Sequence, residues 1–108
     1  MPVQPDYLQY IKDQLSSLEP IEYKNMFGGV GIFKDGVMFA KIGGDTFRLK
    51  VDESNQADFE AKGMKPYFSE KKKKGMPYWE CPQEILDNRD KLKIWAQKSH
   101  SIALKAKK

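Results

Sequence analysis

The sequence predicts one α+β domain with two layers, an antiparallel β-sheet packed with helices. Three observations predict it. The chain has 108 residues, which suits a single domain over residues 1–108 and leaves no room for a second core. The hydrophobic period changes from helical to alternating and back, in the order helix, strands, helix, strands, helix. Turn signals rich in glycine separate the alternating segments.

The first predicted element is a helix that begins near Pro5, a residue suited to a first helical turn, and Pro20 ends it. From Ile21 the apolar residues alternate, which predicts a meander of three or four strands. The turn signals Asp35-Gly36 and Gly43-Gly44-Asp45 separate the strands. The alternating residues are Val30, Ile32, Val37, Phe39, Phe47, Leu49 and Val51. We expect Arg48 and Lys50, which lie between the last three, on the outer face.

The second half of the chain repeats this change of period. Residues 52–62 predict a helix that Gly63 ends, and residues 66–70 and 76–81 predict a hairpin with a lysine-rich turn. Pro82 ends the hairpin and opens a short helix through Leu86. Asn88 is the predicted N-cap of a last helix. The predicted buried stripe of that helix is Leu92, Trp95, Ala96, Ser99, Ile102 and Ala103.

Several stretches together carry a family resemblance. They are residues 26–33 (MFGGVGIF) leading into 36–40 (GVMFA), then 47–52 (FRLKVD), 76–82 (MPYWECP) and 92–96 (LKIWA). In identity, order and spacing they resemble the N-terminal domain of the TfoX (Sxy) family, across nearly the whole chain. The resemblance implies a sheet covered by helices, related to secretion-chaperone-like folds. It also implies transcriptional regulation, because fuller members regulate competence for DNA uptake and carry a C-terminal helical domain that we expect this chain to lack.

The residues that could carry chemistry do not form a recognisable catalytic pattern. Gly28, Gly29 and Gly31 lead into a strand rather than a helix, so we interpret them as a bulge or a close backbone approach, not a phosphate loop. Cys81 is the one cysteine of the sequence and His100 is the one histidine. We interpret Cys81 as a small buried hydrophobic residue rather than a nucleophile. One cysteine and one histidine cannot supply a usual zinc site. We therefore predict no enzyme, no cofactor and no metal.

Four aromatic residues of the second hairpin predict a partner surface. Tyr67 and Phe68 are adjacent, as are Tyr78 and Trp79, so both faces of the sheet are apolar there. Either helices cover both faces, or one face meets another chain. The hypothesis is that this hairpin forms a homodimer or an adaptor surface.

Charge predicts a second kind of contact. The net charge is +4, but residues 71–108 hold eleven Lys or Arg against four Asp or Glu, whereas residues 1–70 are net acidic. The basic turn Lys71, Lys72, Lys73 and Lys74, with Arg48 and Lys50 nearby, is a candidate phosphate contact. We favour a solvated turn, and the sequence shows no motif for reading DNA sequence.

These observations predict a non-enzymatic regulatory or protein-interaction domain with a protein partner. The alternative is a nucleic-acid-associated accessory protein that uses the basic turn and the basic C-terminal residues. We expect a cytoplasmic protein, because the start carries no signal-peptide pattern and no apolar run is long enough to cross a bilayer.

Overall fold

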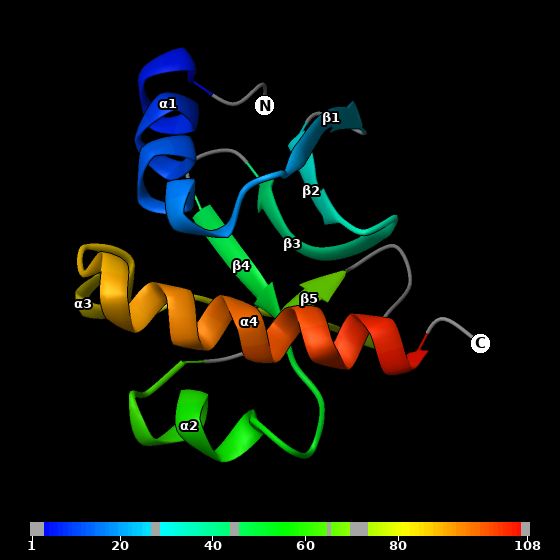
Figure 1. The fold of residues 1–108 in the computed structure, drawn as a ribbon. Helices are drawn as coiled ribbons and strands as arrows, with labels where there is room; N and C mark the ends of the chain where they lie inside the picture. Colours follow the sequence, from blue (N-terminus) through cyan, green and yellow to red (C-terminus); the bar gives the residue numbers. More distant parts are fainter. Residues whose placement is uncertain (1–3, 27–28, 44–45, 65, 70–73, 107–108) are drawn as a thin grey trace.

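The computed structural model describes residues 4–26, 29–43, 46–64, 66–69 and 74–106, with the backbone alone at residues 26, 66–69 and 74–77. The described elements form one antiparallel sheet with helices packed on it, which confirms the α+β prediction (Figure 1). The strands are β1 (Glu22–Met26), β2 (Gly29–Lys34), β3 (Val37–Gly43), β4 (Thr46–Lys50), β5 (Pro66–Ser69) and β6 (Lys74–Glu80). The helices are α1 (Pro5–Gln14), a 3-10 turn η1 (Ser16–Leu18), α2 (Gln56–Ala61), α3 (Gln83–Leu86) and α4 (Arg89–Ala106).

The strands lie in the order β1-β2-β3-β4-β6-β5, so β6 is an inner strand between β4 and β5. The first four strands form the predicted meander. The turn between β2 and β3 has positive φ at Asp35 (55°) and Gly36 (81°), as the turn signal predicts. The residues Gly44 and Asp45 of the second turn signal lie outside the described residues.

The pairing register sorts the side chains onto two faces. Ile32, Ala40, Leu49 and Trp79 stand opposite one another across four neighbouring strands, and all four are buried. This row belongs to the hydrophobic core, together with Ile11 and Leu15 near α1, Phe59 of α2, Ile85 and Leu86 of α3, and Leu92 and Ala96 of α4. The core therefore lies between the helices and this face of the sheet, with α4 against β3 and β4 (Figure 1).

The last helix begins where the sequence predicts. The amide of Lys91 donates to Oδ1 of Asn88 at 3.1 Å, which makes Asn88 the N-cap of α4. Its buried residues are Leu92, Ala96, Ser99, Ile102 and Ala103, and Trp95 is half-buried. The predicted stripe is confirmed.

The second helix starts later than predicted, at Gln56 rather than Asp52. Residues 52–55 form a turn instead, in which the amide of Ser54 donates to Oδ1 of Asp52 at 2.7 Å. The amide of Asp52 donates to Oδ1 of Asn55 at 2.9 Å. These side-chain bonds compete with helical backbone bonds, as is usual for Asp, Ser and Asn. The predicted end is confirmed, since Gly63 has a φ of 76°.

Gly29 confirms the predicted close backbone approach at the entry to β2. A Cβ atom placed there would lie 2.3 Å from the carbonyl oxygen of Ile42 on β3. Gly28 lies outside the described residues. None of the described helices has both the length and the hydropathy that a membrane span requires.

Candidate functional site

The face of the sheet opposite the core carries a group of basic residues. The register places Lys41, Arg48 and Glu80 opposite one another on β3, β4 and β6, one position away from the buried row. Lys50 of β4 stands opposite Tyr78 of β6 on the same face. We call these five residues the outer sheet face. Because side chains alternate along strands, this face points away from the core that the helices cover.

Tyr78 lies at the centre of the outer sheet face. It is 6% exposed, yet it is not part of the hydrophobic core. The ammonium groups of Lys41 and Lys50 each lie 5.4 Å from the centroid of its ring, within the range of a cation–π contact. Burial raises the pKa of Tyr78, so the phenol stays neutral at physiological pH. The ring therefore serves as an apolar support that holds two lysine side chains over it.

The outer sheet face holds three cations and one carboxylate. Lys41, Arg48 and Lys50 are half-buried, as is usual for long basic side chains whose stems lie along a sheet. Glu80 is exposed and faces Arg48 across the strand pair. Such a face attracts carboxylates or phosphates on a partner.

The predicted phosphate contacts are partly placed by the structure. Arg48 and Lys50 lie on the outer face of the sheet, as expected from their alternation with core residues. Lys71, Lys72 and Lys73 lie outside the described residues, and of Lys74 the structure describes the backbone, at the start of β6. Lys41 is a member that the sequence prediction missed. Its alternation with Ala40 and Ile42 was a usable signal, but the assignment needs the pairing of β3 with β4.

The predicted aromatic partner surface requires a correction at Trp79 and Tyr78. Trp79 is 8% exposed and packs in the core, with its ring 6.2 Å from that of Phe59. Tyr78 is on the opposite face, and its neighbours within this chain cover it. The helices cover one face and long basic side chains cover Tyr78 on the other, so neither residue offers an exposed apolar surface. The side chains of Tyr67 and Phe68 lie outside the described residues.

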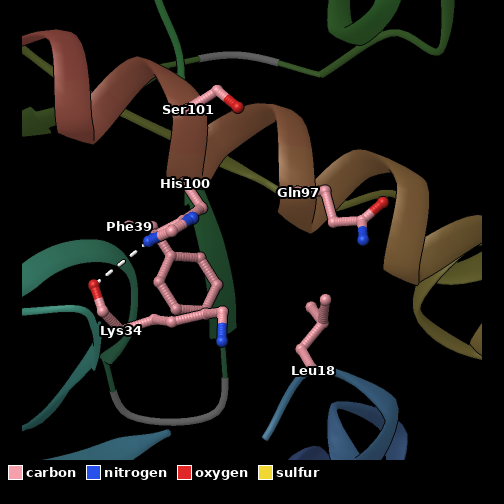
Figure 2. Close-up of a pocket in the computed structure, with 6 residues that line it drawn as sticks. All are labelled: Leu18, Lys34, Phe39, Gln97, His100 and Ser101. Atoms are coloured by element: carbon pink, nitrogen blue, oxygen red, sulfur yellow. Dashed lines mark hydrogen bonds between the residues drawn. The ribbon is translucent and has the colours of Figure 1, made fainter. Parts of the chain in front are cut away.

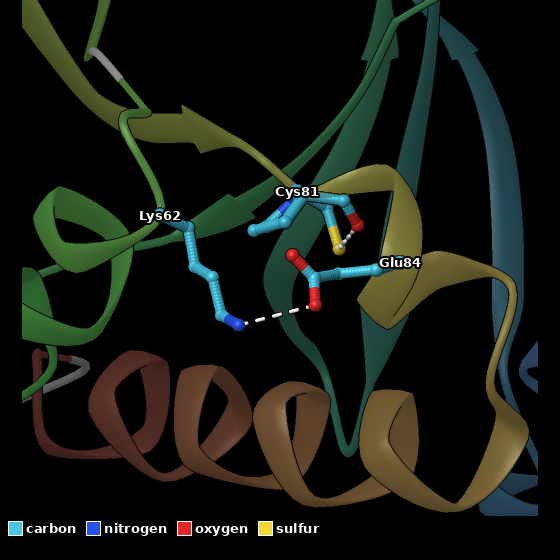
Figure 3. Close-up of polar contacts among 4 residues, drawn as sticks. Lys62, Cys81 and Glu84 are labelled. Carbon is cyan, nitrogen blue, oxygen red and sulfur yellow. Dashed lines mark hydrogen bonds and ion pairs between the residues drawn. The ribbon is translucent and has the colours of Figure 1, made fainter.

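Cys81 is a buried thiol at the end of β6. It is 4% exposed, and its thiol donates to the carbonyl of Pro82 at 3.6 Å. Burial, followed by the charges of Glu80 and Asp87, raises the pKa of the thiol to about 12. The nearby carboxylate of Glu84 is paired with Lys62 at 3.1 Å rather than with the thiol (Figure 3). A thiol with this pKa is almost wholly protonated at neutral pH and is a poor nucleophile.

His100 lies at a different place, on α4 beside the β2–β3 turn. Its Nε2 is 3.1 Å from the carbonyl oxygen of Lys34 and 3.2 Å from Oδ2 of Asp35. Both partners are acceptors, so this nitrogen carries the proton and donates. The ring also meets Phe39 edge-on, with centroids 5.9 Å apart.

A cavity of about 280 Å³ adjoins His100, lined by Leu18, Lys34, Phe39, Gln97, His100 and Ser101 (Figure 2). Cys81 does not line it. The structure therefore does not bring Cys81 and His100 together as a nucleophile and its base. Among the described residues there is no group of three or more His, Cys, Asp or Glu placed to hold a metal ion.

Comparisons with known proteins agree with the sequence motifs. The model of one protein family, described as the TfoX N-terminal domain, matches residues 13–103. The comparison with curated proteins gives no match. The match includes the whole sheet, the 3-10 turn, α2, α3 and most of α4. The chain therefore belongs to the TfoX N-terminal domain family.

Proposed function

We propose that the chain is a non-enzymatic regulatory domain of the cytoplasm that binds an acidic surface of a protein partner through the outer sheet face. Membership of the TfoX N-terminal domain family supports a role in competence-type regulation. The observation that carries the partner assignment is the placing of Lys41 and Lys50 over the neutral ring of Tyr78, with Arg48 on the same face of the sheet. The paired strands set the spacing from which these side chains project, which favours recognition of a defined pattern of carboxylates.

The two residues best suited to chemistry support a binding role. Cys81 is buried and its pKa is raised to about 12, so it is protonated under cellular conditions. The Nε2 atom of His100 is already bonded to the β2–β3 turn. Neither side chain is placed to take a proton from the other.

The proposal predicts that reversing two charges on the outer sheet face weakens partner binding. The test variant is Lys41→Glu with Lys50→Glu. The control is Lys91→Glu with Lys93→Glu, which reverses two charges on exposed positions of α4 and gives the same net charge. Wild-type protein is used to capture a partner from native extract, and the partner is then purified and its Kd measured by calorimetry. We expect the test variant to raise Kd about tenfold or more and the control to change it by less than about twofold.

Two checks accompany this measurement. Circular dichroism must show that both variants fold, because the lysine stems cover Tyr78. Kd for wild-type protein must also rise with salt, since screening weakens contacts between exposed charges. Equal Kd values for the test variant and the control would contradict the proposal.

A second candidate function is that of a nucleic-acid accessory protein, because the same basic face, together with the predicted basic turn Lys71–Lys74, suits phosphate groups. Tyr78 cannot stack on a base while two ammonium groups lie over it and it is 6% exposed. Contact through the outer sheet face would therefore be with phosphates rather than with bases. Fluorescence anisotropy with mixed-sequence DNA at low and moderate salt distinguishes the two functions. Substantial affinity that disappears when Lys71–Lys74 become Ser would favour this candidate over the protein partner.

A further inference from the structure

A groove between α2 and α4 is separate from the outer sheet face. It is a cavity of about 230 Å³ with an aromatic floor. Phe59 and Trp95 form that floor and contact each other edge-on, with centroids 4.8 Å apart. Asp58 of α2 and Lys98 of α4 contribute charged walls, and Ile94 lies at the lip. We call this feature the α2–α4 groove.

Ile94 is unusually exposed for an aliphatic residue. It is 65% exposed, more than Leu104, which is 44% exposed on the same helix. A single exposed aliphatic side chain is ordinary on a protein surface. This one, however, adjoins an apolar hollow on the same surface, so the chain presents a projecting apolar side chain and a groove able to receive one.

The charges of the groove are also complementary to each other. Asp58 and Lys98 are both exposed and come from different helices. Within the part of the chain that the structure describes, neither forms an ion pair. An acid and a base that line one groove without meeting each other can each meet the opposite charge on a second molecule.

We infer that the α2–α4 groove binds a second copy of this chain in a two-fold symmetric dimer. A two-fold contact uses the same patch on both protomers, so the patch must be complementary to itself. This patch meets that requirement twice. Ile94 of one protomer enters the aromatic groove of its partner, and Asp58 of each protomer faces Lys98 of the other. Because the helices lie over the core face of the sheet, the dimer leaves the outer sheet face open, and this inference does not rest on the proposed function.

Sedimentation velocity over protein concentrations from about 10 µM to about 1 mM tests the dimer, a range that covers weak association. We expect wild-type protein to shift from monomer to dimer within it. Ile94→Glu should raise the dimer Kd at least about tenfold, because it places a charge against the aromatic floor. Leu104→Glu is the matched control, an exposed position on the same helix that does not line the groove, and it should dimerise as wild type does.

Charge reversal tests the pairing directly. Asp58→Lys alone and Lys98→Glu alone should each impair dimerisation, because each brings two pairs of like charges together across the two-fold axis. An equal mixture of the two variants should dimerise again, since every pair then joins an acid to a base. A wild-type protein that stays monomeric throughout, a dimer that persists in Ile94→Glu, or a mixture that does not recover would each overturn the inference.

Discussion

At the scale of the residue, Cys81 shows how burial controls reactivity. The thiol is 4% exposed and its pKa is raised to about 12, so the folded chain holds almost no thiolate near pH 8. We expect iodoacetamide to alkylate folded protein at least about 100-fold more slowly than protein unfolded in guanidinium. Mass spectrometry of quenched samples measures both rates. Equal rates would show that the thiol is accessible and would restore it as a candidate nucleophile.

The raised pKa of Cys81 also predicts how the stability of the folded chain changes at alkaline pH. The pKa of Cys81 is raised from 9.0 to about 12, so the thiol loses its proton more readily in the unfolded chain. Its contribution to the free energy of unfolding is full below pH 9 and falls between pH 9 and 12.

Denaturant titrations at several pH values check this dependence. We expect Cys81→Ala to reduce the loss of stability just above pH 9. Tyr23→Phe is a useful comparison, because burial raises the pKa of Tyr23 from 10.0 to about 12 and its effect begins one pH unit higher. A pH profile that Cys81→Ala leaves unchanged would contradict the assignment.

Gly29 illustrates a position where no side chain fits. A Cβ atom would lie 2.3 Å from the backbone oxygen of Ile42, and backbone atoms cannot move aside cheaply. We expect Gly29→Ala to lower the free energy of unfolding by about 2–3 kcal/mol. At Gly43 the nearest atom is the terminal Nη1 of Arg48 at 3.2 Å, so Gly43→Ala should be milder. Urea denaturation of the two variants compares them, and equal losses would argue against the close approach.

At the scale of the element, the end of β4 connects three parts of the fold. The carbonyl of Lys50 accepts a hydrogen bond from the hydroxyl of Ser99 on α4 at 2.8 Å. It accepts another from Nδ2 of Asn55, which precedes α2, at 3.2 Å. Ser99 is 0% exposed and Asn55 is 2% exposed, so both donor residues are buried and depend on this carbonyl as an acceptor.

We expect Ser99→Ala and Asn55→Ala each to reduce stability by about 1–3 kcal/mol, because each removes a buried hydrogen bond. The two changes should not be additive, since both donors bond one carbonyl oxygen. A double-mutant cycle by chemical denaturation measures the coupling. Strict additivity would mean that α2 and α4 are attached to β4 independently.

The elements that the sequence predicts well have local causes. The β2–β3 turn follows from Asp35 and Gly36, and the start of α4 follows from Asn88. The start of α2 was predicted four residues early, because helix-forming composition does not reveal the side-chain bonds of Asp52 and Asn55.

The candidate site was harder to predict than the elements. The outward direction of Arg48 and Lys50 follows from alternation within one strand. Their neighbours Tyr78 and Glu80 depend on the pairing of β4 with β6, which are separated in sequence by α2 and β5. The alternation of residues within one strand does not predict which other strand pairs with it. For the same reason, the sequence could not show that Trp79 faces the core.

At the scale of the whole molecule, α4 is the main cover of the sheet. It lies against β3 and β4 and also contacts α3 and η1. A chain that ends at Asn88 would leave the apolar row of Ile32, Ala40 and Leu49 without this cover. We expect such a chain to bind the dye ANS strongly and to lose cooperative thermal unfolding, because exposed apolar surface with loose packing has these properties. The 108-residue chain is the control, and weak ANS binding by the shortened chain would show that α4 is dispensable.

The position of α4 has a consequence for synthesis on the ribosome. The strands of the meander emerge well before α4, the helix that shields them, which is the last described element to be translated. Until α4 emerges, the apolar faces of the strands in the nascent chain are exposed to other nascent chains and to chaperones. Slower translation of the codons for α4 would therefore lengthen the period in which the nascent chain is most prone to aggregate.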